Sequence, residues 1–598
     1  MGAGQGRPLF LDVERSLSGR RWIDRLDDEG RRTAAAIREA LGIGELAARV
    51  VAGRGIGIDA AADYLNPTLR ALMPDPDTLQ DMAAASRRIA AAIVARESVA
   101  IFGDYDVDGA CSSALLARYL SHFGVETRVH IPDRITEGYG PNTPAIDALA
   151  AEGAGLLITV DCGSMSHEAL AHAAAIGLDS IVIDHHQMGE TLPEALAVVN
   201  PNRADDVSGL GRLCAAGVVF MVLVAINRVL RAMGEPAGPP PDLMGFLDLV
   251  ALATVCDVVP LVGLNRAFVA RGLDVMARQA NLGIAALLRA AGVSGTVSPY
   301  HLGFVIGPRI NAGGRVGDAA LGARLLTIDD GYEAERIAAE LDRLNRERQE
   351  MERIAVEEAI AEADASFDEA TTNVVLTSAP HWHPGIVGLV AARLKERFNR
   401  PAVAIAISGD AGTGSARSIP GVDLGKAVRG GVAAGVLSKG GGHAMAAGLT
   451  VSADRLGDLR AWLDEALADE VRANIDRHLS IDGALGAGAA TTALVAELSH
   501  AEPYGAGNPE PVVVFPSHRL AFADATPQGH IRFRVSGQGD AAVSGIAFRA
   551  AGTPLGEALL ARRGEAMHFA GALRIDRWQG RENVSLHLRD AALPVGRL

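Results

Sequence analysis

Several residue types are scarce in this 598-residue sequence. Its only four cysteines, Cys111, Cys162, Cys214 and Cys256, form no CxxC pair, which argues against a zinc ribbon or a disulfide scaffold. We therefore expect them to be small residues of a hydrophobic core. No G-X-Y period accompanies the 68 glycines, so a collagen-like structure is excluded.

The sequence also lacks a long hydrophobic run. The longest apolar stretch, Cys214–Ile226, ends after about a dozen residues, whereas a membrane-spanning helix needs about 20. The N-terminal residues contain no apolar segment of signal-peptide length. These observations predict a cytoplasmic protein without a membrane span.

Lysine is nearly absent. The sequence has 53 arginines but only three lysines, Lys395, Lys426 and Lys439. We attribute this bias mainly to codon usage in a GC-rich genome, although single arginines can still act as phosphate-binding forks. The net charge of −16 argues against a protein that binds polyanions along its whole length. The charge is unevenly placed, because residues 501–598 carry +2 and the remainder −18.

Apolar runs alternate with helical patterns in the first half of the chain. Ser98–Gly103, Leu156–Val160 and Ser180–Ile183 are short apolar runs, and Ser112–Phe123 and Ser166–Ile176 have helical character. This alternation predicts an α/β fold with a parallel sheet covered on both faces. Sites in such sheets form at the carboxyl ends of the strands, and here each of the three runs is followed by an aspartate.

Acidic and histidine residues gather at those strand ends and after a later apolar stretch. They are Asp104, Asp106 and Asp108 in GDYDVDG, Asp161 in TVDCGS, Asp184-His185-His186, and Asp257 in CDVVP. In an extended segment the i, i+2, i+4 spacing turns the first three carboxylates to one side, and Gly103 and Gly109 leave the backbone free to turn tightly. An EF-hand is excluded because Leu115 occupies the position that requires glutamate.

Each of these residues also has an ordinary structural explanation. Asp161 alone suits a helix N-cap, the His-His pair suits one core and one exposed histidine, and the three aspartates suit a solvated turn. Their joint occurrence at successive strand ends favours a metal site. Oxygen ligands with one or two imidazoles suit Mn²⁺ or Mg²⁺, and two such ions can activate water for phosphoryl chemistry.

The residue pattern changes in the second half of the chain. Asp329–Asp364 is densely charged with a thin apolar stripe, which predicts one exposed connecting helix. A second α/β unit follows, with strand-like Asn373–Leu376 and Ala402–Ile407, helix-like Ile386–Arg397, and two Gly-rich turns at Gly412–Gly414 and Gly440–Gly442. After about residue 475, six short alternating runs predict a small β-barrel or sandwich.

The motifs GDYDVDG, VDCG, DHH and CDVVP, in that order, resemble those of the DHH phosphoesterase superfamily. GGGHAMAAG (Gly440–Gly448) is similar to the hallmark of the associated DHHA1 domain. PRINAGGR (Pro308–Arg315), WHPGIVGLVAARLKERFNRP (Trp382–Pro401) and GSARSIPG (Gly414–Gly421) resemble one branch, the bacterial RecJ single-stranded-DNA exonucleases, and PYGAGNPEP (Pro503–Pro511) resembles the entry to their OB-fold domain. The resemblance runs from about residue 20 to the end.

The resemblance implies roles for individual residues. Two Mn²⁺ or Mg²⁺ ions are expected on Asp104, Asp106, Asp108, Asp161, His185 and Asp257, with Asp161 as the bridge. Asp184 is expected to orient a histidine, and His186 is counted among the catalytic residues, facing either a metal ion or the scissile phosphate. The strand's phosphates are expected to lie against Arg134, Arg309, Asn311, Arg315, Ser415, Arg417 and His443.

This sequence departs from the family pattern at two places. Some superfamily members have a histidine four residues before the second aspartate of the first motif, where this chain has Phe102, so Asp104 is a candidate substitute ligand. After Asp257 the family often has an acidic residue, whereas this chain has Val262 and Leu264. We interpret the second departure as peripheral.

The resulting domain prediction has five segments. They are an N-terminal helical segment (1–75), a parallel-sheet DHH domain (76–328), a connecting helix (329–365), a smaller α/β DHHA1 domain (366–474) and a C-terminal OB-like β-barrel (475–598). In the barrel, five aromatic residues are candidates for base stacking, although most are expected in the core: Phe515, Phe522, Phe533, Phe548 and Trp578.

The function implied is a metal-dependent exonuclease that shortens single-stranded DNA from its 5′ end, releasing mononucleotides in recombination and repair. Candidate partners are a single-strand-binding protein and a helicase, and a monomer is expected by default. One alternative is a phosphodiesterase of the same superfamily acting on cyclic dinucleotides or very short oligonucleotides, which needs no OB-like domain. Another is a non-catalytic DNA-binding scaffold, against which the intact acidic motifs argue.

Overall fold

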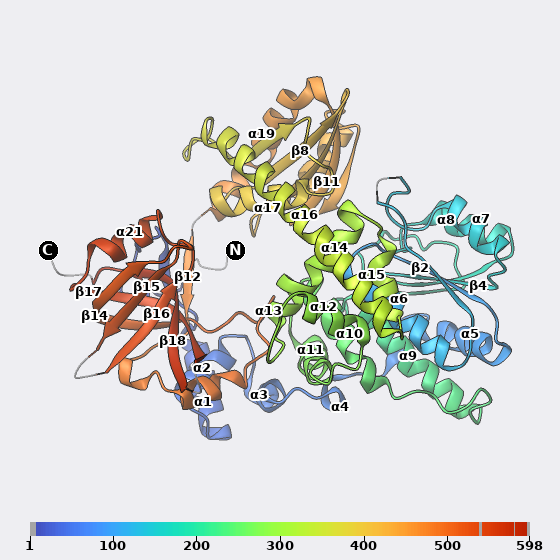
Figure 1. Cartoon of the computed structure of the whole chain (residues 1–598), viewed down its shortest axis with the longest axis horizontal. Coiled ribbons are helices and arrows are strands. Elements are labelled where there is room, and N and C mark those ends of the chain that lie inside the picture. Colours follow the sequence, from blue (N-terminus) through green and yellow to red (C-terminus); the bar gives the residue numbers. More distant parts are fainter. Residues whose placement is uncertain (1–6, 135, 476, 538–540, 579–580, 595–598) are drawn as a thin grey trace. The chain divides into compact units, whose positions relative to one another are not determined.

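A computed structural model describes residues 7–134, 136–475, 477–537, 541–578 and 581–594. These residues form two compact units (Figure 1). The central unit comprises Leu72–Asn474, and the terminal unit combines residues up to Ala71 with residues from Ile475 onward. The terminal unit is therefore built from both ends of the chain.

A five-stranded sheet with all strands parallel organises the first part of the central unit, which confirms the predicted α/β class. Its strands, in spatial order, are β3 (Thr127–His130), β2 (Val99–Gly103), β4 (Leu156–Val160), β5 (Asp179–Ile183) and β6 (Ala197–Val199). All side chains of β2 and β4 are buried, so these strands show as continuous apolar runs. The edge strand β3 is largely polar and β6 has three residues, which explains why the sequence pattern missed both.

Helices cover this sheet and extend the domain beyond it. They are η1 (Pro76–Thr78), α5 (Met82–Ala95), α6 (Val107–His122), α7 (Thr143–Ala151), α8 (His167–Ala175), α9 (Ala215–Ala232), η2 (Leu243–Phe246), α10 (Leu247–Cys256), α11 (Gly263–Met276), α12 (Leu282–Ala290), α13 (Pro299–His301), η3 (Leu302–Ile306), α14 (Gly307–Val316) and α15 (Ala320–Thr327). One of them, α9, is long and apolar enough to cross a membrane, but most of its side chains are buried inside the fold. As predicted, the cysteines are free, and all but the half-buried Cys256 are fully buried.

The connecting helix is confirmed as α16 (Gly331–Asp364), a single helix of 34 residues. Its first half packs on α12, α14 and α15, and its second half packs on α17 and β7 of the second sheet. The predicted apolar stripe holds for Ile337, Leu341 and Leu344, but Ile354 is exposed. In this half of the helix Ala355, Ala359 and Ala363 are the buried residues, and they pack in one cluster with side chains of β7, α17 and β8.

The second sheet has five strands in the order β10-β11-β9-β8-β7 and is mixed. Its elements are β7 (Val375–Ala379), α17 (Val387–Phe398), β8 (Ala402–Ser408), β9 (Ala411–Arg417), α18 (Leu424–Ala433), β10 (Lys439–His443), β11 (Ala446–Ser452), η4 (Ala453–Arg455) and α19 (Leu456–Asn474). The two predicted Gly-rich turns are wrong: Gly412–Gly414 lies in β9 and Gly440–Gly442 lies in β10. A Cβ on Gly414 would lie 2.7 Å from Leu449 and 3.0 Å from Ile405, so this glycine serves close packing.

The terminal unit contains the predicted barrel, with five strands that close through the pairing of β14 with β17. Two of the six predicted runs belong to one strand, β14, which bulges between Phe515 and His518. The elements of this part are β12 (His478–Ile481), β13 (Gly483–Ala484), η5 (Ala487–Ala489), α20 (Thr492–Ser499), β14 (Val513–Ala525), β15 (Ile531–Ser536), β16 (Ala542–Ala547), α21 (Pro554–Ala561), β17 (Ala566–Trp578) and β18 (Arg581–Ala592).

The N-terminal segment belongs to the same unit. The sequence suggested a purely helical segment, but the structure also contains a strand there. It contains β1 (Arg21–Asp24), α1 (Asp28–Leu41), α2 (Glu45–Ala52), α3 (Ile58–Leu65) and the short α4 (Leu69–Leu72). Strand β1 pairs in parallel with β12, the buried Trp22 donates its Nε1–H to Asp590 over 3.0 Å, and Arg25 pairs with Asp482 over 2.8 Å. One hydrophobic cluster contains side chains of α1–α3 and of the barrel.

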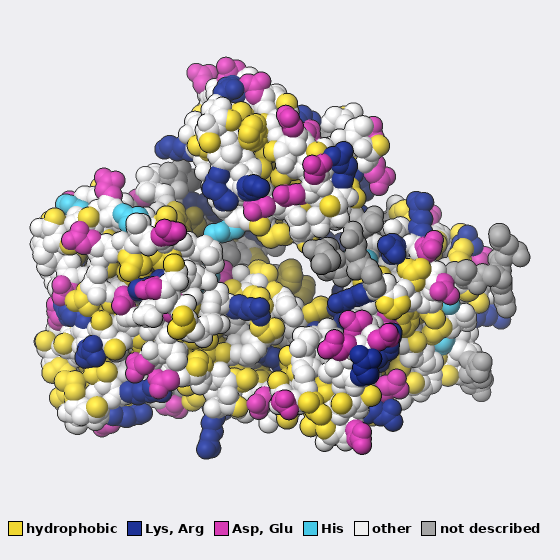
Figure 2. All heavy atoms as spheres, turned by 180° about the vertical axis from the view of Figure 1, so that it is seen from behind, with side chains coloured by type: hydrophobic (Ala, Val, Ile, Leu, Met, Phe, Trp, Pro, Cys, Tyr) yellow, Lys and Arg dark blue, Asp and Glu magenta, His cyan; other side chains and the backbone are white. Residues whose placement is uncertain are grey.

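Charges of both signs are interspersed on the face of the molecule drawn in Figure 2. Many arginines have carboxylate partners one helical turn away. For example, Arg353 pairs with Glu350 over 2.7 Å and with Glu357 over 2.8 Å. The abundance of arginine therefore does not by itself mark a polyanion-binding surface, and a functional arginine must be identified from its surroundings.

Candidate metal centre

The predicted acidic residues meet at one edge of the first sheet. Strands β2, β4 and β5 are neighbours and run parallel, so their carboxyl ends lie side by side. Asp104 follows β2, Asp161 follows β4, and Asp184 follows β5. All three side chains are buried, which removes them from the water that would otherwise stabilise their charge.

The start of α6 brings two further carboxylates to this edge. Asp106 is the N-cap and accepts hydrogen bonds from the amides of Asp108 and Gly109 at 2.8 and 3.1 Å. Asp108 accepts from the first amides of α9, those of Ala215 and Ala216, at 2.6 and 2.8 Å. The expected tight turn at Gly109 is wrong: this residue is helical, and its missing Cβ makes room for the backbone of Asp104, which would lie 2.3 Å away.

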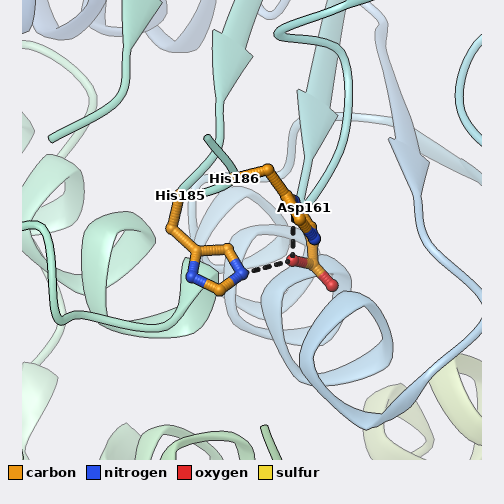
Figure 3. A group of neighbouring side chains, drawn as sticks. All are labelled: Asp161, His185 and His186. Atoms are coloured by element: carbon orange, nitrogen blue, oxygen red, sulfur yellow. Dashed lines mark ion pairs between the residues drawn. The ribbon is translucent and has the colours of Figure 1, made fainter. Parts of the chain in front are cut away.

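His185 presents one ring nitrogen to the carboxylates. Its Nδ1–H donates to the carbonyl of Leu213 over 3.0 Å, which leaves Nε2 as the ring nitrogen that faces the carboxylates. This nitrogen lies 3.3 Å from Oδ1 of Asp161 (Figure 3). It also lies 3.8 Å from carboxylate oxygens of Asp108 and Asp257. Where Nε2 carries no proton, its lone pair and those of the carboxylate oxygens repel at such distances unless a cation lies between them.

Asp161 is the central carboxylate. Its backbone has φ +60°, a left-handed conformation that is uncommon for a residue with a side chain. Its buried Oδ1 has no hydrogen-bond donor among the described residues. It is not the N-cap of the next helix, because α8 is preceded by Ser166. A strained residue with a buried, unsatisfied oxygen marks a functional position.

Asp184 has a different environment. Its Oδ1 accepts from the amides of His185 and His186 at 2.7 and 3.2 Å and from Nδ1 of His186 at 2.8 Å. Its Oδ2 accepts from the amide of Ser164 at 3.1 Å. Because both oxygens are satisfied by the protein, Asp184 is suited to orient His186 rather than to bind an ion.

Two asparagines that the sequence analysis did not single out hold the His-His pair in place. The buried Asn200 donates to the carbonyl of His186 over 2.9 Å and to the hydroxyl of Ser164 over 2.8 Å. Asn202 donates to the carbonyl of His185 over 2.5 Å. The sequence signal was the Asn-Pro-Asn run directly after β6, at the same sheet edge.

The donor atoms form three overlapping groups, each with atoms within 4.8 Å of one another. The groups are Asp104-Asp106-Asp161, Asp108-His185-Asp257 and Asp161-His185-His186. Carboxylate oxygens with one imidazole suit hard divalent cations such as Mn²⁺ and Mg²⁺. The unsatisfied oxygen of Asp161 and Nε2 of His185 therefore suit the binding of divalent cations at this edge of the sheet.

Burial and mutual repulsion raise the pKa values of the cluster. Burial, followed by the charges of Asp108 and Asp106, raises the pKa of Asp161 well above its usual range. The same causes raise the pKa of Asp257 to about 9. Burial disfavours the charged form of His186 and so lowers its pKa. The hydrogen bond to Asp184 outweighs this effect and raises the pKa of His186 to about 9. In the metal-free centre these carboxyls therefore resist ionisation, and a bound cation would favour their charged form.

The metal-free protein is expected to lose stability as the pH rises. A carboxyl whose pKa is raised by folding ionises less readily in the folded chain than in the unfolded one, so ionisation opposes folding between the two pKa values. For Asp257 this window runs from its ordinary 3.8 to about 9. We expect the Tm of the chelator-treated protein to fall across this window and Mn²⁺ to raise it most at the alkaline end. Asp257→Asn should flatten the slope, and a slope unchanged by this substitution would contradict the prediction.

An aromatic pair and a group of arginines border the carboxylates. Tyr139 donates its hydroxyl to the carbonyl of Asp161 over 3.1 Å, and its ring is perpendicular to that of Tyr105. The guanidinium of Arg134 lies over the Tyr105 ring at 5.2 Å. Sequence reasoning identified Arg134 but missed both tyrosines, although they lie inside the motifs that contain Asp104 and Arg134.

Arg315 and Arg417 belong to the same group. Arg315 donates to the carbonyl of Gly385 over 2.9 Å, and Arg417 donates to the hydroxyl of Ser415 over 3.1 Å. Burial and the charges of Arg134 and Arg417 lower the pKa of Arg315 to about 10, while Asp106 opposes this effect. Three arginines that repel one another beside the carboxylates suit the binding of an anion such as a phosphate.

Three other residues stay predicted phosphate ligands. Arg309 on α14 pairs with Asp342 of α16 over 2.9 Å, and Asn311 is half-buried two residues later. His443 is exposed at the end of the edge strand β10. Within the described ranges, none of the three has a hydrogen bond or ion pair with the acidic cluster.

Phe102 stands where some superfamily members have a histidine. The structure places its side chain in the core, fully buried and 4.9 Å from the ring of His130. This position therefore offers an apolar contact, and the nearby Asp104 contributes the carboxylate at this side of the centre.

The barrel aromatics divide into two groups. Phe515 and Phe533 are buried in the barrel core, whereas Phe522 and Phe548 are about half exposed, at 50% and 53%. The side chain of Trp578 lies outside the described residues. Only the exposed pair remains a candidate for base stacking.

Three family models match the chain. They are the DHH family, N-terminal domain (residues 98–254), the DHHA1 domain (371–469) and the RecJ OB domain (481–590). The first covers the sheet that carries Asp104, Asp161 and His185. Fold, site and these matches define the class as a DHH phosphoesterase.

Comparison with known proteins and solved structures identifies the branch of this class to which the chain is similar. The single-stranded-DNA-specific exonuclease RecJ of Bacillus subtilis is 33% identical over 96% of this chain and 71% of its own length. RecJ of Escherichia coli is 37% identical over 75% of this chain and 80% of its own. A crystal structure of Thermus thermophilus RecJ in complex with Mn²⁺ matches with a TM-score of 0.79 and 29% identity, covering 94% of this chain and 78% of that one. The chain belongs to the RecJ family.

Proposed function

We propose that this protein is a metal-dependent exonuclease that hydrolyses single-stranded DNA from its 5′ end and releases 5′-mononucleotides. The observation that carries the proposal is the approach of Nε2 of His185 to the buried, unsatisfied Oδ1 of Asp161, with 3.3 Å between the two atoms. They lie within a group of carboxylates that suits two divalent ions. Whole-chain similarity to single-strand-specific exonucleases supports the substrate class.

We propose that Asp104, Asp106, Asp108, Asp161, His185 and Asp257 hold two Mn²⁺ or Mg²⁺ ions. When bound, such ions activate water and stabilise the leaving oxygen of a phosphodiester. The protein's contribution is to hold the donors rigidly, through the α9 amides on Asp108 and the Leu213 carbonyl on His185. His186, held protonated by Asp184, is then available to donate a hydrogen bond to a phosphate oxygen.

The arginine group supports a role in holding the 5′ end. Arg134, Arg315 and Arg417 with Ser415 supply several donors next to the carboxylates, so a terminal phosphate bound there lies close to the metal ions. An enzyme that anchors the end beside its reaction centre removes one nucleotide at a time. Exonuclease action and mononucleotide products follow from this geometry.

The remaining assignments extend this proposal. We propose that residues 475–598 bind the strand away from the reaction centre through the barrel, and that residues 366–474 contribute Ser415, Arg417 and His443 to substrate binding. A single-strand-specific enzyme needs a strand that other proteins expose, so a helicase and a single-strand-binding protein are the proposed partners in recombination and repair. A cytoplasmic monomer is the proposed working state.

An end-labelling time course tests the function. Single-stranded DNA labelled at either end is incubated with Mn²⁺, beside a duplex and a cyclic dinucleotide. Labelled mononucleotide should appear at once from the 5′-labelled strand, and the 3′-labelled strand should shorten gradually, while the duplex stays intact. Hydrolysis of the cyclic dinucleotide alone would overturn the proposal in favour of a small-molecule phosphodiesterase.

Replacement of Arg417 tests the anchor for the 5′ end. Arg417→Ala removes charge-assisted hydrogen bonds, each worth about 1.5–3 kcal/mol, so KM for a 5′-phosphorylated oligonucleotide should rise roughly 10- to 100-fold. A 5′-hydroxyl oligonucleotide should be affected far less. Arg397→Ala, which removes an exposed arginine on α17, is the matched control. Equal effects of Arg417→Ala on both substrates would remove this residue from the phosphate site.

A further inference from the structure

Two aromatic rings are stacked on one another at the surface of the central unit. Tyr300 and Phe304 have exposed fractions of 59% and 73%. Their ring centroids are 5.2 Å apart and their planes differ by 23°. Exposed, nearly parallel rings leave their outer faces open to water, which is unfavourable unless another flat group covers them.

The turn that carries these rings packs against the helix end that supplies a proposed metal ligand. Tyr300 lies in α13 and Phe304 in the following turn η3, which has π-helical geometry, a form that is frequent at functional sites. The carbonyl of Leu302 in this turn lies 3.4 Å from Sγ of Cys256. Asp257 is the next residue, so the aromatic pair is joined to the metal centre by a short, packed segment.

The far end of the same turn lies beside positive charge. Arg309 donates to the carbonyl of Val305 over 2.6 Å and to Asp342 over 3.0 Å. The other oxygen of Asp342 accepts from Arg346 over 3.0 Å. One carboxylate shared by two guanidinium groups leaves an excess of one positive charge within this trio, and Arg309 joins the trio to the turn that carries Phe304.

Stacked rings beside a net positive charge suit a single-stranded nucleic acid, whose bases are flat and whose backbone is anionic. We propose that Tyr300 and Phe304 form a stacking platform for an unpaired base of the substrate strand, with Arg309 and Arg346 facing its phosphates. This inference rests on the proposed function and deepens it. It also gives Arg309 a role, although the structure does not place it at the metal centre.

The consequence is a specificity for unpaired bases close to the metal centre. A base in a duplex already stacks on its neighbours and pairs with its partner, so it cannot cover the Tyr300–Phe304 rings. A free base can, and because every base has a flat face the contact does not depend on sequence. The platform would therefore favour single strands without selecting among them.

The test compares the double variant Tyr300→Ala/Phe304→Ala with the control Tyr332→Ala, which removes a still more exposed tyrosine (83%) from α16. Stacking of one base is worth about 1–3 kcal/mol, so the double variant should raise KM for a long single strand by roughly 5- to 100-fold. Its kcat on saturating substrate should change little, and the control variant should match the wild type.

A scan of abasic sites makes the test specific. Oligonucleotides with one missing base at successive positions should show one position where the wild type loses affinity, measured by fluorescence anisotropy with Ca²⁺ replacing Mn²⁺. The double variant should lose that positional effect, since the base has no platform to cover. A positional effect of the same size in both proteins, or a change of the double variant's mass in sedimentation, would overturn the proposal, the latter by indicating a contact between copies. Because the anisotropy measurement needs no hydrolysis, it separates failure of the platform from failure of the proposed activity.

Discussion

Asp161→Asn is expected to abolish Mn²⁺-dependent hydrolysis while stabilising the metal-free protein. Asparagine keeps the shape of the side chain and tolerates the left-handed backbone at φ +60°, so the fold should be retained. The substitution removes the carboxylate that two donor groups share. We expect hydrolysis to fall by at least about 10²–10³-fold, the loss typical when one group that stabilises developing charge is removed.

The gain in stability separates this prediction from simple unfolding. Asp161 is buried and faces the charges of Asp108, Asp106, Asp104 and Asp257, so a neutral amide at this position relieves repulsion. The Tm of the metal-free variant should lie above that of the metal-free wild type, and Mn²⁺ should raise it less. Asp147→Asn, which alters an exposed carboxylate bonded to His172, is the control for both measurements. Normal turnover by Asp161→Asn would refute the metal centre.

Removal of residues 475–598 is expected to do more than weaken DNA binding. The deletion leaves the N-terminal segment without the partner that buries Trp22, Val50 and Val51. Burial of each such side chain is worth about 1.5–3 kcal/mol, so the segment should unfold and expose apolar surface. We expect the chain 1–474 to aggregate at concentrations where the chain 72–474 stays monodisperse.

The shorter chain 72–474 is the matched control, because it removes both halves of the terminal unit together. It should retain Mn²⁺-dependent hydrolysis of very short oligonucleotides and lose affinity for long strands. Equal solubility of the chains 1–474 and 72–474 in light scattering would contradict the shared core.

The first sheet was predictable because buried parallel strands and the aspartates that follow them leave a strong local pattern. β2, β4 and β5 lie within one residue of their predicted limits. The Gly-rich strands β9 and β10 were not predictable, because glycine is typical of turns and only close packing, such as Leu449 against Gly414, explains it in a strand. The pairing of β1 with β12 was not predictable from sequence for another reason, because the partners are more than 450 residues apart.

In the candidate site, too, the residues in local motifs were predictable and the contacts between distant residues were not. The carboxylates and histidines lie in short motifs, so their types and spacing pointed to a metal centre. Their supports are separate in sequence: Asn200 and Asn202 hold the histidines, and the amides of Ala215 and Ala216 hold Asp108. Arg309 matched a phosphate-binding motif, yet its partner Asp342 lies 33 residues away on α16, and no local pattern indicates such a pair.

The union of both chain ends in one unit has a consequence for protein synthesis. The first 71 residues emerge from the ribosome long before the strands that cover them. At about 5–20 residues per second, the roughly 400 residues in between take on the order of 20–80 s. During this time the apolar side of α1–α3 is open to chaperones and proteases. A truncated mRNA that lacks its last codons therefore yields a protein whose N-terminal segment stays exposed. Chaperones and proteases can recognise such a protein by this exposed apolar surface.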